Sequence, residues 1–463
     1  MVYFTYIKRG ELVMAKRMKK ILLLCISLVL LALLASCNSP SDDFPETEQP
    51  SVTTTVTTKK AGKTIPDLII KTESSTPITS NETYLVASVS ITGETDTTLD
   101  REGAQIRGRG NSTWRFFDKK SYRIKFDEKV DLFGMGAARD YNLLANAMDM
   151  TMMQNYIALT LMAQLDDSFT PKCTFVHLHL NGQYMGVFLL TERIEQDKER
   201  LDIGSGKSGE PDVGYLVEFG GNVDYKEKPN FKIDPVEFNG KTIAWRDAFR
   251  AVIKSPDETI VTKEQKKYIE EYIEKVNRAI YTQDFETFSE LCDVDSFVAN
   301  VLVNELMLAN DFDFNFHMYK EEGGKLFLGP VWDFDQACGI STKSGGTMYG
   351  WTVSKYPCWI TALLEMPQFY ELVRQKWIDN YDLIHGITAE IYEKAEQMQY
   401  DINLNFRCWD VLGKPYWRMT EEMADLDTYE GFLDRLAWWL DNRIIWIDKE
   451  FGLFRYDYKP SDN

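Results

Sequence analysis

The chain has 463 residues, of which 44% are hydrophobic and 13% aromatic. A chain of this length can bury a sizeable core in one two-lobed domain or in two domains, and its composition excludes a wholly disordered protein. The formal net charge of -19 argues against a nucleic-acid partner, because phosphate backbones bind basic surfaces.

The N-terminus carries the most specific local pattern of the chain. A basic segment, residues 16–20, precedes an apolar run at residues 21–34 that is shorter than the roughly 20 residues of a membrane-spanning helix. The run closes in LASC at residues 34–37, which resembles the lipobox of bacterial lipoproteins. We therefore predict a lipoprotein signal peptide over residues 1–37, with a lipidated Cys37 that anchors an extracytoplasmic protein in the bacterial cell envelope. A signal anchor with an incidental cysteine is the alternative.

The other boundaries follow from composition. Residues 38–63 are rich in Ser, Thr, Pro and acidic side chains, which predicts a flexible linker. A folded domain is expected over residues 64–455, followed by a short tail at residues 456–463. The first residues fit no part of a signal peptide, which makes Met14 and Met18 candidate translation starts.

Hydrophobic periodicity predicts strands in the first half of the domain and helices in the second. The expected strands are residues 65–72, 83–91 and 214–219, with a hairpin over residues 175–190. A polar loop is expected from the strand at 214–219 to about Pro256. The expected helices are residues 143–164, 265–281, 297–308 and 432–451. Five cysteines remain in the mature domain, without CxxC spacing, so buried free thiols are favoured over a disulfide framework or a zinc site.

The predicted hairpin carries three polar features. Asn181-Gly182 is the dipeptide favoured in two-residue hairpin turns. His177 and His179 share one strand face, but no third metal ligand is evident, so a structural role is favoured over metal binding. Glu192 at the end of the hairpin could pair with a phosphate-binding lysine or cap a helix.

Residues 105–126 are predicted to form a loop between two strands. The centre of this loop, IRGRGNSTW at residues 106–114, combines glycines with arginines. Glycine lets backbone amides approach an anion and arginine supplies positive charge, so Arg107, Arg109 and Asn111 are candidates for binding phosphate. A surface turn with solvated charges is the alternative.

An acidic segment with the runs NDFDFN and VWDFD contains the candidate catalytic centre. The second run follows a strand-like stretch, and period-two alternation predicts that Asp333 and Asp335 lie on one face. Paired carboxylates suit Mg²⁺. Asp311, Asp313 and Asn315 are then candidates for a catalytic base and a second metal contact. A solvated turn after a strand is the alternative.

These motifs, in their order and spacing, resemble the CotH family over residues 65–453. The resemblance is carried by the 106–114 loop with KKSYR at residues 119–123, LNGQYMGV at residues 180–187, NEL at residues 304–306 and GPVWDFD at residues 329–335. It implies an α+β, two-lobed atypical protein-kinase-like fold. An antiparallel, β-rich N-lobe and a mainly helical C-lobe would hold a nucleotide between them.

The resemblance also implies roles for the acidic residues. The Trp-Asp-x-Asp element of the family is thought to hold the metal of the nucleotide, so Asp333 becomes the main ligand of Mg²⁺ or Mn²⁺ and Asp335 its helper. The upstream catalytic base is Asp311, with Asp313 in reserve, and Asn315 is the second metal contact. Asp311 and Asn315 are four residues apart, which is one residue fewer than in the ordinary kinase pattern.

Lys120 is preferred over Lys119 and Lys125 as the lysine that contacts phosphate, with Glu192 as its partner and Arg109 beside it. Together these assignments predict transfer of a phosphoryl group from ATP to the hydroxyl of a protein substrate at the cell envelope. The alternative is a non-catalytic surface lipoprotein with the same fold, which would act as an adhesin, an envelope assembly factor or a polysaccharide-binding module.

Overall fold

The computed structural model describes residues 62–93, 95–220, 228–245, 249–309, 315–342, 347–351 and 359–453. All of them belong to one compact unit, Ala61–Asn463. Their mixture of strands and helices confirms the predicted α+β class. The predicted signal peptide with Cys37, most of the linker, the tail, Asp311 and Asp313 lie outside the described residues.

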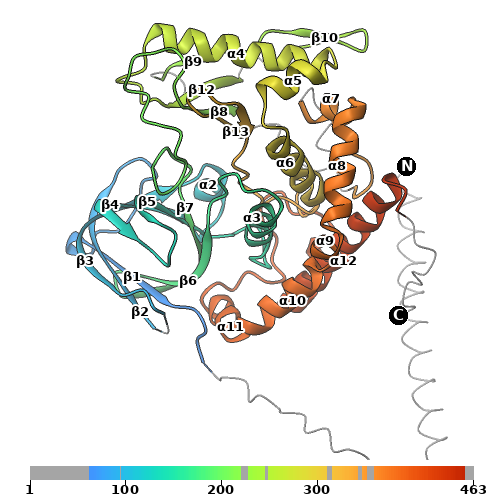
Figure 1. The fold of residues 1–463 in the computed structure, drawn as a ribbon. Helices are drawn as coiled ribbons and strands as arrows, with labels where there is room; N and C mark the ends of the chain where they lie inside the picture. Colours follow the sequence, from blue (N-terminus) through green and yellow to red (C-terminus); the bar gives the residue numbers. More distant parts are fainter. Residues whose placement is uncertain are drawn as a thin grey trace, which may run out of the picture. The chain divides into compact units, whose positions relative to one another are not determined.

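The first strands of the chain form a closed barrel, drawn in blue to green in Figure 1. They are β1 (Asp67–Thr72), β2 (Leu85–Thr92), β3 (Leu99–Arg109), β4 (Ser121–Asp131), β5 (Ala137–Leu144), β6 (Cys173–Leu180) and β7 (Gln183–Glu192). Neighbours follow the order β1-β2-β3-β4-β5-β7-β6, and the parallel pairing of β1 with β6 closes the ring. Apolar side chains such as Ile106, Ile124 and Leu143 fill the interior, so the residues that alternate with them face outward.

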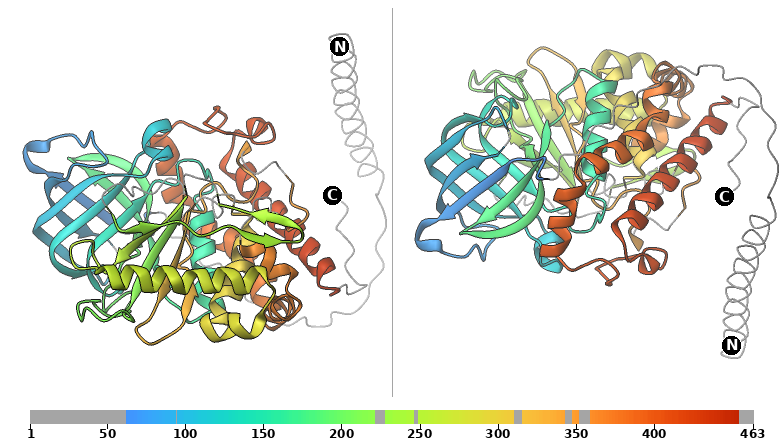
Figure 2. Two further views of the ribbon diagram at one scale, coloured as in Figure 1. Left: turned by 90° about the horizontal axis from the view of Figure 1, so that it is seen from above. Right: turned by 90° about the horizontal axis from the view of Figure 1, so that it is seen from below.

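A second, antiparallel sheet has the order β14-β13-β8-β12-β9. Its strands are β8 (Tyr215–Gly220), β9 (Asn230–Phe231), β12 (Arg250–Ser255), β13 (Asn315–Lys320) and β14 (Leu326–Leu328). Next to it lie the hairpin β10 (Val236–Phe238) and β11 (Lys241–Ile243) and the helices α4 (Lys263–Tyr281), α5 (Phe285–Leu291) and α6 (Val294–Met307). Figure 2 shows α4 running across this sheet, where Ile269 and Ile273 share one core with Val217 and Ala251.

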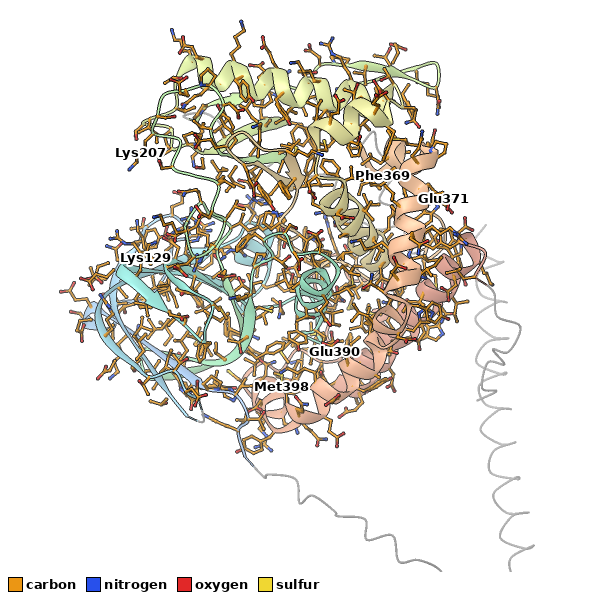
Figure 3. The ribbon with its side chains drawn as sticks, viewed as in Figure 1. Lys129, Lys207, Phe369, Glu371, Glu390 and Met398 are labelled. Atoms are coloured by element: carbon orange, nitrogen blue, oxygen red, sulfur yellow. The ribbon has the colours of Figure 1, made fainter. Side chains whose placement is uncertain are left out.

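The rest of the chain is helical, as predicted. It contains α7 (Trp359–Glu365), α8 (Pro367–Asp379), α9 (Tyr381–His385), α10 (Ile387–Gln397), α11 (Gln399–Cys408) and α12 (Tyr429–Glu450). Figure 3 shows side chains filling the space between these helices, where Phe369 of α8 is buried while Glu371 of the same helix is exposed. In α12, which contains the helix expected at residues 432–451, Trp439 is buried in the core, whereas the adjacent Trp438 is 51% exposed.

The predicted loop at residues 105–126 is wrong. Strand β3 continues to Arg109, and after Gly110 the short helix α2 (Ser112–Phe116) leads into β4. The glycines have packing and turn roles: a Cβ on Gly108 would lie 2.2 Å from the ring of Trp114, and Gly110 adopts a φ of +88° where the strand ends. Arg107 and Arg109 are therefore held on a rigid strand rather than on a flexible loop.

Two other boundaries also differ from prediction. The polar loop expected up to Pro256 contains β9 to β12. Strands β9, β10 and β11 have only two or three residues each, which is too short for a periodic pattern, whereas β12 is a mostly buried strand of six residues that the prediction missed. The helix predicted within residues 143–164, with Asp149 or Thr151 expected near its start, is α3 (Gln154–Leu165), which starts after a turn at those residues. In that turn the carboxylate of Asp149 accepts hydrogen bonds from the backbone amides of Thr151 and Gln154. This local capping, which hydrophobic periodicity does not register, sets the helix start.

The hairpin turn and the free thiols follow the predictions more closely. Asn181 and Gly182 have φ values of 53° and 81°, as a two-residue hairpin turn with a left-handed backbone requires. Cys292 and Cys338 are buried free thiols, whereas Cys408 is exposed.

Candidate active site

A cavity of about 1210 Å³ opens between the outer face of the barrel and the second sheet. Strands β3, β4 and β5 supply one wall and β8, β12 and β13 supply the other. Among the predicted residues, Arg107, Arg109, Asn111, Asp333 and Asp335 all line this cavity. Barrel strands and a segment more than 200 positions later in the chain thus meet at one place, as the predicted phosphate and metal sites require.

Asp333 and Asp335 both reach the cavity, but the alternation of a strand, which the sequence predicted, is not what places them there. Strand β14 ends at Leu328, and Asp333 has a left-handed backbone with a φ of 67°. The amide of Phe334 between them donates a 2.9 Å hydrogen bond to Asn155 Oδ1 of α3. Because α3 holds this backbone, a turn rather than a pleated strand directs both carboxylates into the cavity.

The electrostatics of the pair favour a bound cation. The side chain of Asp333 is exposed to the cavity, and that of Asp335 is half-buried at its wall. Burial raises the pKa of Asp333, and burial together with Asp333 and Asp149 raises the pKa of Asp335. Arg109 attracts both carboxylates through space, but within the described ranges neither accepts a hydrogen bond. Two neighbouring carboxylates without hydrogen-bond donors are stabilised by a cation between them.

The available carboxylate ligands suit Mg²⁺ better than a metal ion that is coordinated by three or more protein side chains. In the described ranges no group of three or more His, Cys, Asp or Glu side chains is placed to hold a metal ion. Mg²⁺ typically takes one or two carboxylates and completes its shell with water and phosphate oxygens. Asn315, the predicted second contact, begins β13, and this strand contributes to the cavity wall through His317.

The predicted pairing of Lys120 with Glu192 is not present. The ammonium of Lys120 donates to the carbonyl of Trp114 at 2.6 Å, away from the cavity lining. Glu192 lines the cavity, but it accepts from the amide of Lys172 at 2.7 Å and faces Arg200 at 3.7 Å. Glu192 therefore interacts with residues at the rim of the barrel and does not pair with a phosphate-binding lysine.

A lysine–glutamate pair does line the cavity on its opposite wall. Lys254 of β12 contacts Glu218 of β8 at 2.7 Å. His317 of β13 stands directly opposite Glu218 in the sheet and packs edge-on against Trp332, 5.0 Å between ring centroids. Burial lowers the pKa of His317 to about 4, so its ring is neutral at pH 7. Sequence reasoning predicted the strand at residues 214–219 that carries Glu218, but it predicted neither β12 nor β13 and therefore did not find Lys254 or His317.

The two hairpin histidines are structural, as expected. His177 is buried, and its ring nitrogens contact Tyr184 Oη and an Asp401 carboxylate oxygen, each at 2.8 Å. His179 contacts a carboxylate oxygen of Asp67, also at 2.8 Å. Each histidine is satisfied by partners on neighbouring elements, and neither lies at the cavity.

Comparison with known proteins decides the family. A family model described as CotH kinase protein matches residues 106–447, which is most of the chain. The chain belongs to the CotH family. The inner spore coat protein H of Bacillus subtilis (strain 168) is 24% identical over 227 residues, covering 49% of this chain. The match spans 56% of that relative, little more than half its length. The family match contains the CotH motifs at residues 106–114 and 329–335 that line the cavity.

Proposed function

We propose that this CotH-family chain is an atypical protein kinase that transfers a phosphoryl group from ATP to a protein hydroxyl at the cell envelope. The observation that carries the proposal is the pair of carboxylates, Asp333 and Asp335, that line a cavity of about 1210 Å³ together with Arg109. Such a cavity can hold a nucleotide. The family description as a kinase supports the same reading, with the barrel side as the β-rich lobe and the helices as the second lobe.

Each residue of the cavity then has a defined task. Asp333 and Asp335 hold Mg²⁺ or Mn²⁺, with Asn315 as the further contact. The bound ion supplies neutralisation of phosphate charge. Arg109 contacts the phosphates from the barrel wall. Lys254, oriented by Glu218, takes the phosphate-contacting role that was predicted for Lys120.

Asp311 is the catalytic base for the acceptor hydroxyl in this proposal. This carboxylate orients the acceptor hydroxyl and takes its proton while the hydroxyl oxygen bonds to the γ-phosphorus and the bond to the bridging oxygen of ADP breaks. The protein supplies positioning and electrostatic stabilisation, which are the main sources of rate enhancement in phosphoryl transfer.

The decisive experiment compares two aspartate variants. Asp333→Asn should abolish the rise in thermal stability that Mg²⁺ and ATP give the parent, since ligand binding to the folded state stabilises it by mass action. Asp311→Asn should retain that rise but lower autophosphorylation, measured with labelled ATP, by roughly 10²-fold or more. Asp410→Asn, at a side chain that is 87% exposed, is the matched control and should behave as the parent.

A parent protein that neither binds nucleotide nor incorporates label with Mg²⁺ or Mn²⁺ would contradict the proposal. The chain would then be better described as a non-catalytic surface lipoprotein.

We further propose that the protein acts outside the cytoplasm, held by a lipid on Cys37. The lipobox-like LASC motif supports this location, and the membrane would then be the partner of the N-terminus alone.

A further inference from the structure

Two arginines on neighbouring barrel strands face each other without a carboxylate between them. Arg107 of β3 is paired directly with Arg123 of β4, and both line the cavity. Arg107 donates to the backbone carbonyls of Asn81 and Gly108, and Arg123 Nε donates to Asn142 Oδ1 at 3.3 Å. Arg107 also lies over the ring of Tyr84 at 5.1 Å, and Glu195 attracts Arg123 through space, but within the described residues neither guanidinium forms an ion pair. Like charges directly opposite each other destabilise a sheet, so the arrangement calls for an anion.

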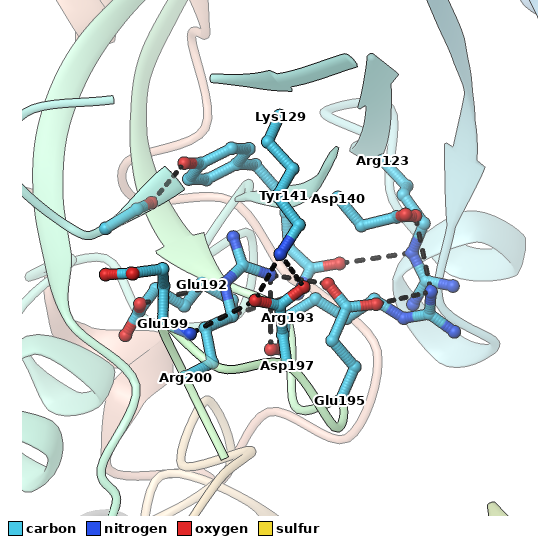
Figure 4. A network of polar contacts seen from close by, with 12 residues as sticks. Arg123, Lys129, Asp140, Tyr141, Glu192, Arg193, Glu195, Asp197, Glu199 and Arg200 are labelled. Carbon is cyan, nitrogen blue, oxygen red and sulfur yellow. Dashed lines mark hydrogen bonds and ion pairs between the residues drawn. The ribbon is translucent and has the colours of Figure 1, made fainter. Parts of the chain in front are cut away.

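Further guanidinium groups surround the pair. Burial and the charges of Arg193, Arg109 and Arg107 lower the pKa of Arg123 to about 10. Figure 4 shows the adjacent network, in which Arg193 contacts Asp140 at 3.3 Å and Glu195 at 3.0 Å. Arg193 and Arg200 engage Asp140, Glu192 and Glu195, and Lys129 engages Asp197. Arg107 and Arg123 remain the cations at this wall whose charge lacks an ion-pair partner in the described residues.

The nucleotide alone does not account for this wall. In protein kinases the metal ions bridge the phosphates and neutralise their charge, and Arg109 is the arginine whose charge Asp333 and Asp335 attract most strongly. The cavity of about 1210 Å³ also exceeds the roughly 300–1,000 Å³ of ordinary small-molecule pockets. Room and positive charge are left for a second ligand.

Building on the proposed kinase function, we propose that Arg107 and Arg123 bind a carboxylate of the acceptor, so that the substrate is an acidic protein segment with Glu or Asp beside the phosphorylated hydroxyl. Guanidinium groups form bidentate, charge-assisted pairs with carboxylates. The net charge of -19 does not oppose this contact, because surface charges beyond about 8–10 Å are screened at physiological ionic strength. The arginine pair then decides which segment enters the cavity.

The test uses synthetic peptides with one serine flanked by Glu, by Gln or by Lys. Label transfer from ATP gives kcat/KM for each peptide, thermal shift with Mg²⁺ and ADP reports the nucleotide site, and fluorescence anisotropy reports direct binding of the Glu peptide. The variants are Arg107→Gln, Arg123→Gln and both together. Lys125→Gln is the matched control, since Lys125 lies two positions along β4 from Arg123 but is exposed and outside the cavity.

The parent should prefer the Glu peptide by about 10-fold or more, as loss of a charged hydrogen bond is worth. The double variant should lose this preference through a higher KM, with the ADP shift unchanged. If the double variant loses the ADP shift, the arginines serve the nucleotide, and the proposal is overturned while the kinase function stands. A parent that binds ADP but prefers the Gln or Lys peptide overturns it as well.

A parent without any nucleotide-dependent shift refutes the kinase function itself. Fluorescence anisotropy then tests the acidic-segment site independently of the kinase function. Arginine-dependent binding of the Glu peptide would keep the acidic-segment site, and absence of such binding would remove it.

Discussion

At the scale of single residues, the environment of Asp335 lowers the stability of the folded protein. Burial, Asp333 and Asp149 all raise the pKa of this carboxyl group. A carboxyl group whose folded-state pKa lies above its unfolded value favours folding when protonated, and this contribution is lost as the pH rises through the folded-state pKa. At neutral pH the raised pKa of Asp335 therefore destabilises the metal-free folded protein relative to the unfolded chain.

Asp335→Asn should accordingly make the metal-free protein more stable at pH 8, by roughly 1–3 kcal/mol, and should change stability little at pH 4. The neutral amide removes both the buried charge and its repulsion from Asp333. Urea unfolding at the two pH values in a chelator measures the difference. An Asn variant with the same pH dependence as the parent would show that the carboxylates do not repel each other in the folded state.

The sequence named Asp333, Asp335 and Arg109 correctly as cavity residues, but it missed Arg123. A carboxylate pair beside a strand-like run is visible in one segment of the chain. The position of Arg123 opposite Arg107 depends on the register of two strands joined by a helix, and periodicity within one strand does not fix that register.

At the scale of elements, α11 is fastened to the barrel by polar contacts. Asn405 Oδ1 accepts from the amide of Val187 at 3.1 Å and from the ammonium of Lys119 at 2.9 Å. Gly186 leaves room for this contact, because a Cβ there would lie 2.6 Å from Asn405 Oδ1. Burial lowers the pKa of Lys119 to about 7. Helix docking thus holds a lysine in a place that disfavours its charge.

Lys119→Met should remove a specific pH dependence. A lysine with a folded-state pKa of about 7 and a higher unfolded pKa binds fewer protons folded than unfolded, so stability rises with pH from about 7 towards 10. The Met variant should lack this rise in urea unfolding across pH 7 to 9.5. Lys120→Met, at the half-buried neighbour whose ammonium meets the Trp114 carbonyl, is the control. Equal slopes for both variants would contradict the assignment.

Predictions of helices and turns succeeded where the sequence shows one apolar face of a long helix or the dipeptide of a tight turn. Residues 265–281 became α4 (Lys263–Tyr281), and Asn181-Gly182 became the hairpin turn. They failed where tertiary packing decides the conformation. Gly108 looked like part of a flexible loop, yet it is a glycine because the Trp114 ring covers it in a strand.

At the scale of the whole molecule, the proposed membrane anchor lies outside the folded unit. Among the described residues, none of the helices combines the length and apolar character that crossing a bilayer requires. On the lipobox-like LASC motif, Cys37→Ser should shift the full-length protein from the membrane fraction to the soluble fraction or leave it unprocessed, since the thioether that carries the lipid can no longer form. Fractionation and the mass of the mature N-terminus measure this. A variant that partitions and is cleaved like the parent would refute the lipid anchor.

The closure of the barrel by β1 also has a mechanical consequence. Thr64, just before β1, donates from its hydroxyl to an Asp401 carboxylate oxygen at 2.6 Å, and β1 itself is hydrogen-bonded to β2 on one side and β6 on the other. A pull on the chain at its N-terminal side acts along β1, so both ladders resist in shear and their hydrogen bonds must break together. A protein tethered by that end would bear traction at the wall of its barrel farthest in sequence from Asp333, and the carboxylates of Asp333 and Asp335 would be shielded from the load.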